Sequence, residues 1–174
     1  MAWFVPQKYF DMFPLNEVTT PKLLSNDLDD VPARGIELTD GKSGFVDAVL
    51  EHGLHEEAVQ AYLATTAYAD AQIGRVLDAL QKTPYAENTI VVFSSDHGDM
   101  LWSQGRTKKQ QPWEESVHIP LIVRWPNGLA AGQDTDLLVS VADYAPTLLG
   151  LAGIPVPEYM NGLDLSALLP STND

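Results

Sequence analysis

The most regular hydrophobic pattern of the chain lies between Glu56 and Lys82. Apolar and small side chains recur there at alternating steps of three and four residues, namely Val59, Tyr62, Thr66, Ala69, Ile73, Val76 and Leu80. That spacing places them on one face of a helix. The pair Thr83-Pro84 ends the pattern, because the residue before a proline is pushed out of the α region. The segment is therefore predicted to be an amphipathic helix whose apolar face packs in the core.

Two short apolar runs without alternation follow this helix. They span Thr89–Ser95 and Pro120–Trp125, and the first is rich in β-branched residues. Runs of this kind are typical of strands covered on both faces, as in a parallel sheet between helices. The polar segment Asp96–His118 separates them and is too long to be a simple turn. Long polar loops in compact domains often carry function, so this segment is a candidate functional loop.

The first 50 residues show no helical or strand periodicity. Four prolines are spaced too closely for long helices, namely Pro6, Pro14, Pro21 and Pro32. Structureless stretches of this length are uncommon inside a compact domain. We therefore expect an irregular segment that wraps over a larger body.

The C-terminal part is predicted to contain short helices. Asp143 can cap a helix that runs through Leu151, with Pro146 in its first turn and Gly153 as its stop. A second short helical piece is expected around 163–169. Helix, strand, long loop, strand and helix in this order indicate part of an α/β sandwich.

Length and composition fit a folded chain. With 174 residues, 45% of them apolar, it is expected to form one domain, or at most two, and it is not disordered. We predict a single partial domain over 1–174, with 1–50 as the wrapping segment and 55–165 as the α/β core portion. No apolar run reaches the roughly 18 residues of a membrane span.

The charge balance and the absence of cysteine exclude several functions. Ten Lys and Arg residues face 24 Asp and Glu residues, which gives a net charge of −14. Such a chain is repelled by polyanions, so neither nucleic acid nor an anionic membrane is an expected partner. Without cysteine there is no disulfide, zinc–thiolate site or thiol nucleophile in this chain.

The residues at the end of the first predicted strand can carry chemistry. In open α/β sheets ligands bind at the carboxyl ends of strands, and Asp96 and His97 leave the strand at this point. Gly98 allows a sharp turn, and Asp99 adds a second acid. The pair can hold a divalent cation, or the imidazole can act as acid or base. Taken locally, an Asp that simply caps a turn explains the pattern equally well.

The same loop carries a basic cluster, made up of Arg106, Lys108 and Lys109. A lysine ammonium suits an anionic oxygen as a compact point charge. An acid and an imidazole for a metal, beside cations for an anion, are typical of the hydrolysis or transfer of a phosphate or sulfate ester. A solvated charged loop is the alternative for each cation taken singly.

These residues belong to two runs with a family resemblance. The run from Asn88 to Leu101 (NTIVVFSSDHGDML) and the run from Lys109 to Arg124 (KQQPWEESVHIPLIVR) resemble the later half of the sulfatase family, in the alkaline-phosphatase superfamily. The resemblance covers roughly 55–165. It implies an α/β fold in the form of a partial alkaline-phosphatase-like sandwich, with a parallel-rich sheet flanked by helices.

The resemblance also implies roles for individual residues. Asp96 and His97 match the late pair of metal ligands of the family, which usually bind Ca²⁺, with Mg²⁺ as the alternative. Lys109 matches the lysine that contacts the sulfate, and Lys108 is an adjacent competitor for that role. Lys109 and His97 are thus the expected catalytic residues. The implied substrate is a sulfated small molecule or glycan.

Two departures from the family pattern limit this expectation. The formylglycine nucleophile arises from a Cys/Ser-x-Pro-x-Arg motif, which the chain does not contain, and an early acidic pair of metal ligands is also missing. Trp102 and Gln104 stand where relatives often carry Gly and His. The chain therefore resembles the back part of a sulfatase and is expected to be inactive alone.

Several alternatives remain open from the sequence. A phosphodiesterase or phosphonate hydrolase of the same superfamily fits the same residues, and so does a noncatalytic binding or assembly module. The family is mostly exported or lysosomal, yet the N-terminus lacks the basic region and cleavage site of a signal peptide, which leaves localisation open. If the strand Ile90 to Phe93 has an uncovered apolar edge, self-association through that edge is expected.

Overall fold

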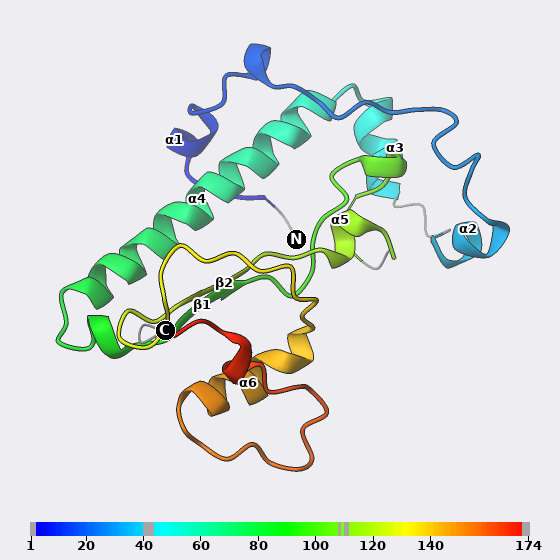
Figure 1. Cartoon of the computed structure of the whole chain (residues 1–174). Helices are drawn as coiled ribbons and strands as arrows, with labels where there is room; N and C mark the ends of the chain where they lie inside the picture. The colour runs from blue at the N-terminus through cyan, green and yellow to red at the C-terminus, as the bar shows by residue number, and fades with distance from the viewer. Residues whose placement is uncertain (1–2, 40–43, 108, 110–111, 172–174) are drawn as a thin grey trace. The chain divides into compact units, whose positions relative to one another are not determined.

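The computed structural model describes residues 3–39, 44–107, 109 and 112–171 (Figure 1). The chain divides into two compact units. Unit 1 comprises Met1–Lys82 and His97–Pro120, and unit 2 comprises Thr83–Asp96 and Leu121–Asp174. The chain passes from unit 2 into unit 1 between Asp96 and His97. The expectation of a single domain stays a prediction, and each unit is described by itself.

Unit 1 is helical in the part that the structure describes. Its helices are α1 (Gln7–Phe10), α2 (Ala33–Thr39), α3 (Gly44–Glu51), α4 (His55–Gln81) and α5 (Glu114–Val117), with 3₁₀ turns at Leu15–Glu17 and Ser103–Gly105. The long helix α4, with 27 residues, confirms the helix predicted from the apolar periodicity. It begins and ends one residue earlier than the pattern suggested.

The first 50 residues are less irregular than expected. They contain α1, α2 and α3, none longer than eight residues. Pro6 and Pro32 directly precede α1 and α2, where a missing backbone N–H costs nothing and the fixed φ angle favours a helical start. The prolines therefore limit the length of these helices and also help to begin them.

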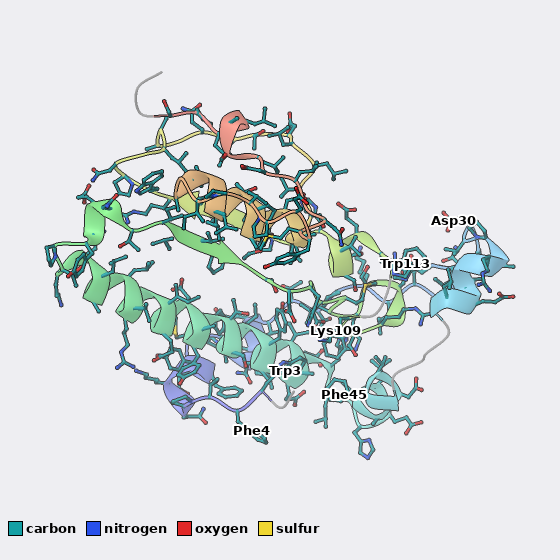
Figure 2. The ribbon with its side chains drawn as sticks, turned by 90° about the horizontal axis from the view of Figure 1, so that it is seen from below. Trp3, Phe4, Asp30, Phe45, Lys109 and Trp113 are labelled. Carbon is teal, nitrogen blue, oxygen red and sulfur yellow. The ribbon has the colours of Figure 1, made fainter. Side chains whose placement is uncertain are left out.

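The core of unit 1 joins α3, the start of α4 and the loop after Asp99. Its buried side chains are Val46, Val49, Ala58, Val59 and Trp102. Around them, the ring of Trp3 makes edge contacts with Phe45 at 5.9 Å and with Tyr62 at 5.8 Å between ring centroids. Figure 2 labels Trp3 and Phe45. Only the beginning of the predicted apolar face of α4 is buried, since Val76 on the same face is 69% exposed.

In its described residues, unit 2 contains a two-stranded sheet and one α-helix. The strands β1 (Val91–Ser94) and β2 (Leu121–Arg124) pair antiparallel, with Val91 opposite Arg124 and Ser94 opposite Leu121. The expected parallel arrangement of these two strands is wrong. Parallel pairing needs a crossover, usually a helix, and the only α-helix described between the strands is the four-residue α5. The α/β class is unaffected.

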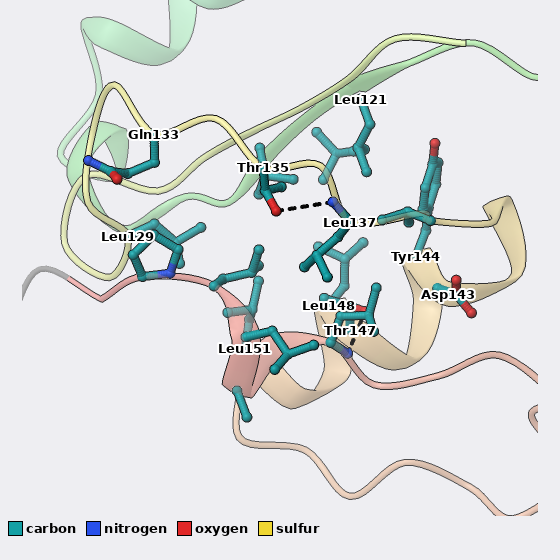
Figure 3. A pocket seen from close by; sticks show the side chains of 18 of the residues that line it. Leu121, Leu129, Gln133, Thr135, Leu137, Asp143, Tyr144, Thr147, Leu148 and Leu151 are labelled. Carbon is teal, nitrogen blue, oxygen red and sulfur yellow. Dashed lines mark hydrogen bonds between the residues drawn. The ribbon is translucent and has the colours of Figure 1, made fainter. Parts of the chain in front are cut away.

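The strands also differ from the expectation in their burial. Phe93 is 41% exposed and Ile122 is 59% exposed, so the sheet is not covered on both faces by the described residues. A cavity of about 510 Å³ lies against Val92 of β1 and Leu121 of β2, and the helix α6 (Tyr144–Leu151) also lines it (Figure 3). Its lining is mostly aliphatic. Unit 2 therefore keeps apolar surface that its own described residues do not fill.

The segment around α6 follows the sequence prediction in part. Gly153 has φ +68° and ends the helix as predicted, and Pro146 is buried near its start. Asp143, however, does not cap α6 with its side chain. Its carboxylate accepts hydrogen bonds from the backbone N–H groups of Ser140 and Leu163, both at 2.8 Å. These two bonds hold the pKa of Asp143 below its usual range, and they tie two segments of unit 2 together.

The second predicted helical piece is present as the 3₁₀ turn Ser166–Leu168. A further close approach occurs at Gly162, where a Cβ atom would lie 1.9 Å from the carbonyl oxygen of Ala142. No side chain fits there. Of the helices that the structure describes, none is long and apolar enough for a bilayer crossing.

Candidate active site

The predicted site residues fall on both sides of the unit boundary. Asp96 is exposed and belongs to unit 2, just after β1, whereas His97 is partly buried and begins the second segment of unit 1. Lys109 is exposed and lies in unit 1 on the loop before α5, where Figure 2 labels it. Lys108 lies outside the described residues. His97 and Lys109 are thus brought into one unit, and Asp96 is joined to it through the backbone.

The imidazole of His97 has a defined tautomer. Its Nδ1 atom lies 2.7 Å from the carbonyl oxygen of Gly98. Because a carbonyl can only accept, Nδ1 carries the proton, and the lone pair of the neutral ring is on Nε2. A hydrogen bond to one ring nitrogen is also how ligating histidines are commonly oriented. His97 is therefore suited to bind a cation, or to accept a proton, through Nε2.

Gly98 fixes the His97 segment against α5. Its N–H donates to the carbonyl oxygen of Ser116 at 2.9 Å. A Cβ atom at this position would lie 1.8 Å from the carbonyl oxygen of Glu115, far inside van der Waals contact. The sequence suggested that Gly98 allows a sharp turn. The structure adds that it lets two backbones touch, so that His97 and the end of the Lys109 loop are held together.

The turn after Asp99 has an uncommon backbone conformation. Leu101, Trp102 and Gln104 have φ angles of +37°, +70° and +47°, although none is glycine. Left-handed backbone of this kind costs energy and persists only where the surroundings determine it. The Leu101 N–H donates to Oδ1 of Asp99 at 2.9 Å, and the Trp102 N–H donates to the carbonyl oxygen of Arg106 at 2.6 Å.

Burial of Trp102 holds this turn in place. Its side chain is completely buried, and its ring centroid lies 4.7 Å from that of His55. Fully burying a side chain of this size stabilises the fold by about 3–5 kcal/mol, which offsets the roughly 1–3 kcal/mol that the positive φ angle of Trp102 itself costs. No sequence pattern predicts this turn, because large residues seldom adopt positive φ angles.

The two described cations of the cluster, Arg106 and Lys109, do not behave alike. Arg106 is 7% exposed and its neighbour Thr107 is 6% exposed, so this part of the loop is packed inside unit 1. Lys109 remains exposed and can meet an anionic ligand. Arg106 therefore belongs to the packed interior of the loop, and among the described cations of the cluster Lys109 is the candidate for substrate contact.

Tyr62 is an electrostatic neighbour of Asp99. The periodicity of the helix indicated only a core residue at this position. Burial, and then the negative charge of Asp99, raise the pKa of Tyr62 above its usual value. The phenol therefore stays protonated well above neutral pH. Tyr62 and Asp99 act on each other, although they lie on α4 and on the loop before Trp102.

The described residues do not form a complete metal site. Among them, no group of three or more His, Cys, Asp and Glu side chains is arranged to hold a metal ion. Ca²⁺ takes six to eight oxygen ligands, and Mg²⁺ takes near-octahedral oxygen ligands. Asp96 can supply an oxygen donor to such a set, whereas the side chain of His97 can supply only a nitrogen. The remaining donors are not among the side chains that the structure describes.

A family model described as Sulfatase matches residues 5–154. The chain therefore belongs to the sulfatase family. This match agrees with the resemblance carried by the segment from Asn88 to Arg124.

Known proteins agree with this family and with its fold. A sulfatase of Formosa agariphila is 40% identical over 152 residues, which covers 87% of this chain and 30% of that protein. An N-acetylglucosamine-6-O-sulfatase of Bacteroides thetaiotaomicron is 36% identical over 115 residues, 66% of this chain and 21% of that protein. The structure of a phosphonate monoester hydrolase of Silicibacter pomeroyi aligns with a TM-score of 0.79 at 26% identity, over 94% of this chain and 34% of that one.

The chain spans about a fifth to a third of the length of these proteins. The neighbours confirm the α/β fold of the alkaline-phosphatase superfamily. A sulfuric ester hydrolase family is the class that the chain and its relatives share.

Proposed function

We propose that this chain supplies part of the active site of a sulfate-ester hydrolase, with Lys109 as the sulfate contact and His97 as an acid or base. The observation that carries the proposal is the clamp at Gly98, which ties the His97 segment to the helix that follows the Lys109 loop in a chain of the sulfatase family. Equilibrium binding of a sulfate monoester, with a phosphonate monoester as competitor, tests it.

The two residues have distinct roles in this proposal. The ammonium of Lys109 neutralises the anionic oxygens of the ester, whose charge must be stabilised for the S–O bond to break. His97 accepts or delivers a proton at Nε2, because Nδ1 is engaged with the carbonyl oxygen of Gly98. Lys108 remains the adjacent alternative for the sulfate contact.

The proposal includes a sulfated sugar as the substrate. The relative from Bacteroides thetaiotaomicron is named for 6-O-sulfated N-acetylglucosamine. A phosphonate monoester is the second candidate, since the neighbour with a TM-score of 0.79 is named for that reaction. A lysine and an imidazole do not by themselves distinguish sulfate from phosphonate. The binding competition does.

The nucleophile is expected to come from outside this chain. The sequence has no cysteine and no Ser-x-Pro-x-Arg motif, from which a formylglycine is made in the family. A covalent step at sulfur needs such a group. The chain alone should therefore bind a sulfate ester without turning it over.

A divalent cation completes the proposed site, with Asp96 as one of its donors; His97 would be a second donor only in place of its role as acid or base, because both roles use Nε2. When bound, Ca²⁺ or Mg²⁺ neutralises the ester and polarises its oxygens. A ligand that binds only the folded chain raises its melting temperature. We expect 10 mM CaCl₂ to raise the melting temperature of the wild type. It should not change the melting temperature of the Asp96→Asn variant. An Asp136→Asn control should show the same rise as the wild type.

An equal Ca²⁺ shift in all three proteins would show that the cation binds elsewhere. Loss of the shift in the Asp136→Asn control would contradict the assignment in the same way. Asp136 suits the control because it is exposed and lies outside the loop of the proposed site.

A further inference from the structure

Two Asn-Gly pairs of the sequence have no role in the mechanism above. They are Asn127-Gly128, in the turn after β2, and Asn161-Gly162, in the loop after α6. An asparagine before a glycine can lose its side-chain amide spontaneously, because the glycine has no Cβ atom to hinder attack by its own backbone nitrogen. Both asparagines are exposed, and both pairs belong to unit 2. The same folded unit therefore offers two candidate sites for this reaction.

The backbone of the first pair is engaged in hydrogen bonds. The Gly128 N–H donates to the carbonyl oxygen of Trp125 at 3.0 Å, and the Asn127 N–H donates to that of Glu87 at 3.1 Å. A Cβ atom at Gly128 would lie 2.1 Å from the ring of Trp125, so this residue is also closely packed. The nitrogen of Gly128 must give up its hydrogen bond before it can attack the Asn127 side chain.

The second pair is held in a different way. Within the described residues, neither the Gly162 N–H nor the Asn161 side chain makes a hydrogen bond. The close contact of Gly162 is made at its Cα, where a Cβ atom would lie 1.9 Å from the carbonyl oxygen of Ala142. This contact does not engage the nitrogen of Gly162. That nitrogen therefore has no hydrogen bond to lose before it reacts.

We infer that Asn161 is a site of spontaneous deamidation in the folded protein and that Asn127 is protected. The nitrogen of Gly162 gives its proton to solvent base and forms a bond to Cγ of Asn161, and the side-chain nitrogen leaves as ammonia. Water then opens the resulting succinimide ring at one of its two carbonyls. The products are aspartate, with the ordinary backbone, and isoaspartate, whose backbone is longer by a methylene group. Either product adds a negative charge.

The isoaspartate product would disturb a closely held part of unit 2. Directly after Gly162, the Leu163 N–H donates to Oδ1 of Asp143 at 2.8 Å. The contact of Gly162 with Ala142 leaves little room for a shift of the backbone. An extra methylene before Gly162 therefore works against the bond to Asp143, whereas an ordinary aspartate at position 161 does not.

Peptide mapping by mass spectrometry compares the two pairs in one sample. After the full chain has aged in mildly alkaline buffer, Asn161 should be converted about two- to tenfold faster than Asn127, the range expected when one hydrogen bond must be released. In concentrated urea the difference should disappear, because both glycines then lose their contacts. Equal rates in the folded chain, faster conversion of Asn127, or no conversion of Asn161 would overturn the inference. A difference that persists in urea would also overturn it, since the fold would then not be its cause.

Melting temperatures test the effect of the longer backbone. Aged protein can be isolated by anion exchange through its added charge, and an isoaspartate methyltransferase measures its isoaspartate content. It should melt about 3–10 °C below the fresh protein, the size expected for the loss of one hydrogen bond to a charged group. Asn161→Asp carries the added charge on an ordinary backbone and should melt like the fresh wild type.

A further variant removes the reaction itself. Asn161→Ser has no side-chain carbonyl to attack, so its melting temperature should not change on ageing. Isoaspartate-containing protein that melts like Asn161→Asp, or an Asn161→Ser variant that loses stability on ageing as the wild type does, would contradict the effect assigned to position 161.

Discussion

At the scale of single residues, backbone contacts determine the site as much as side chains do. Gly98 holds two backbones in contact, and the carbonyl oxygen of the same residue sets the tautomer of His97. The identity of residue 98 therefore affects both the stability of unit 1 and the position of a proposed catalytic group.

Replacing Gly98 by alanine should be strongly destabilising. The added Cβ atom would overlap the carbonyl oxygen of Glu115, and such overpacking costs about 1–3 kcal/mol. Urea denaturation of the full chain measures the change. Gly74→Ala is the matched control, because Gly74 lies in α4 with open space around it and helix propensity predicts a gain of about 0.5–1 kcal/mol. A Gly98→Ala variant as stable as the wild type would contradict the close contact.

The sequence predicted some site residues and missed others for identifiable reasons. Asp96 and His97 were predicted to follow the first strand, and they do, because a strand that ends in a polar pair is visible in a local pattern. The contact between Ser103 and Glu115 joins residues twelve apart with no periodic signal. The burial of Arg106 was also missed, since charge alone suggested solvent.

At the scale of elements, periodicity predicted the long helix α4 better than the sheet, and it missed the short helices α1, α2 and α3. The 3.6-residue pattern of α4 is local and strong, so its existence followed from the sequence. The direction in which β1 and β2 pair depends on the path between them, and an apolar run carries no information on that path. Asp143 was predicted to cap α6, but its carboxylate accepts a hydrogen bond from the backbone N–H of Leu163. A local pattern does not indicate this partner, since Leu163 lies twenty residues away.

Asp143 makes unit 2 sensitive to acid. Its folded pKa is lowered, so its stabilising effect is complete above the unfolded pKa of about 3.9 and is lost as the pH falls through the folded value. The melting temperature of the wild type should therefore fall as the pH drops below about 4 and through the lowered folded pKa of Asp143. Asp143→Asn should melt lower at neutral pH and show a flatter pH dependence.

The acid sensitivity of the Asp143→Asn variant should be reduced and not abolished. Asp164 also has a lowered pKa, through its hydrogen bonds with the side chain and backbone of Ser166. Exposed Asp136 provides the control, and Asp136→Asn should follow the wild-type curve. Parallel pH curves for the wild type and the Asp143→Asn variant would contradict the assigned role.

At the scale of the whole molecule, the sulfatase family model matches residues 5–154 of the chain. The chain itself spans only about a fifth to a third of the length of its relatives. The resemblance to the family was recognised from two local runs, 88–101 and 109–124, which contain the residues of the proposed site. The family model agrees with that resemblance. The surface left by the described residues includes apolar side chains of the sheet, among them Phe93 and Ile122. Exposed apolar strands are sites of association between chains.

Self-association through the β1–β2 sheet is accordingly part of our proposal. At about 100 μM, light scattering coupled to gel filtration should give a mass above that of the monomer, although the net charge of −14 opposes it. Ile122→Lys places a charge on the exposed strand and should shift the mass toward the monomer, whereas Val76→Lys on α4 should not. A monodisperse monomeric wild type would contradict this part of the proposal.

The central claim is that this chain carries the sulfate-binding part of a sulfatase-family site. The most direct measurement is the affinity of 4-nitrophenyl sulfate for the wild type, for Lys109→Ala and for Lys8→Ala, whose lysine is exposed on α1. We predict binding by the wild type and by Lys8→Ala, and a loss of about tenfold or more in Lys109→Ala, the size expected for a hydrogen bond to a charged group. Equal affinities of the three proteins, or stronger binding of a phosphonate monoester than of the sulfate ester, would contradict the claim.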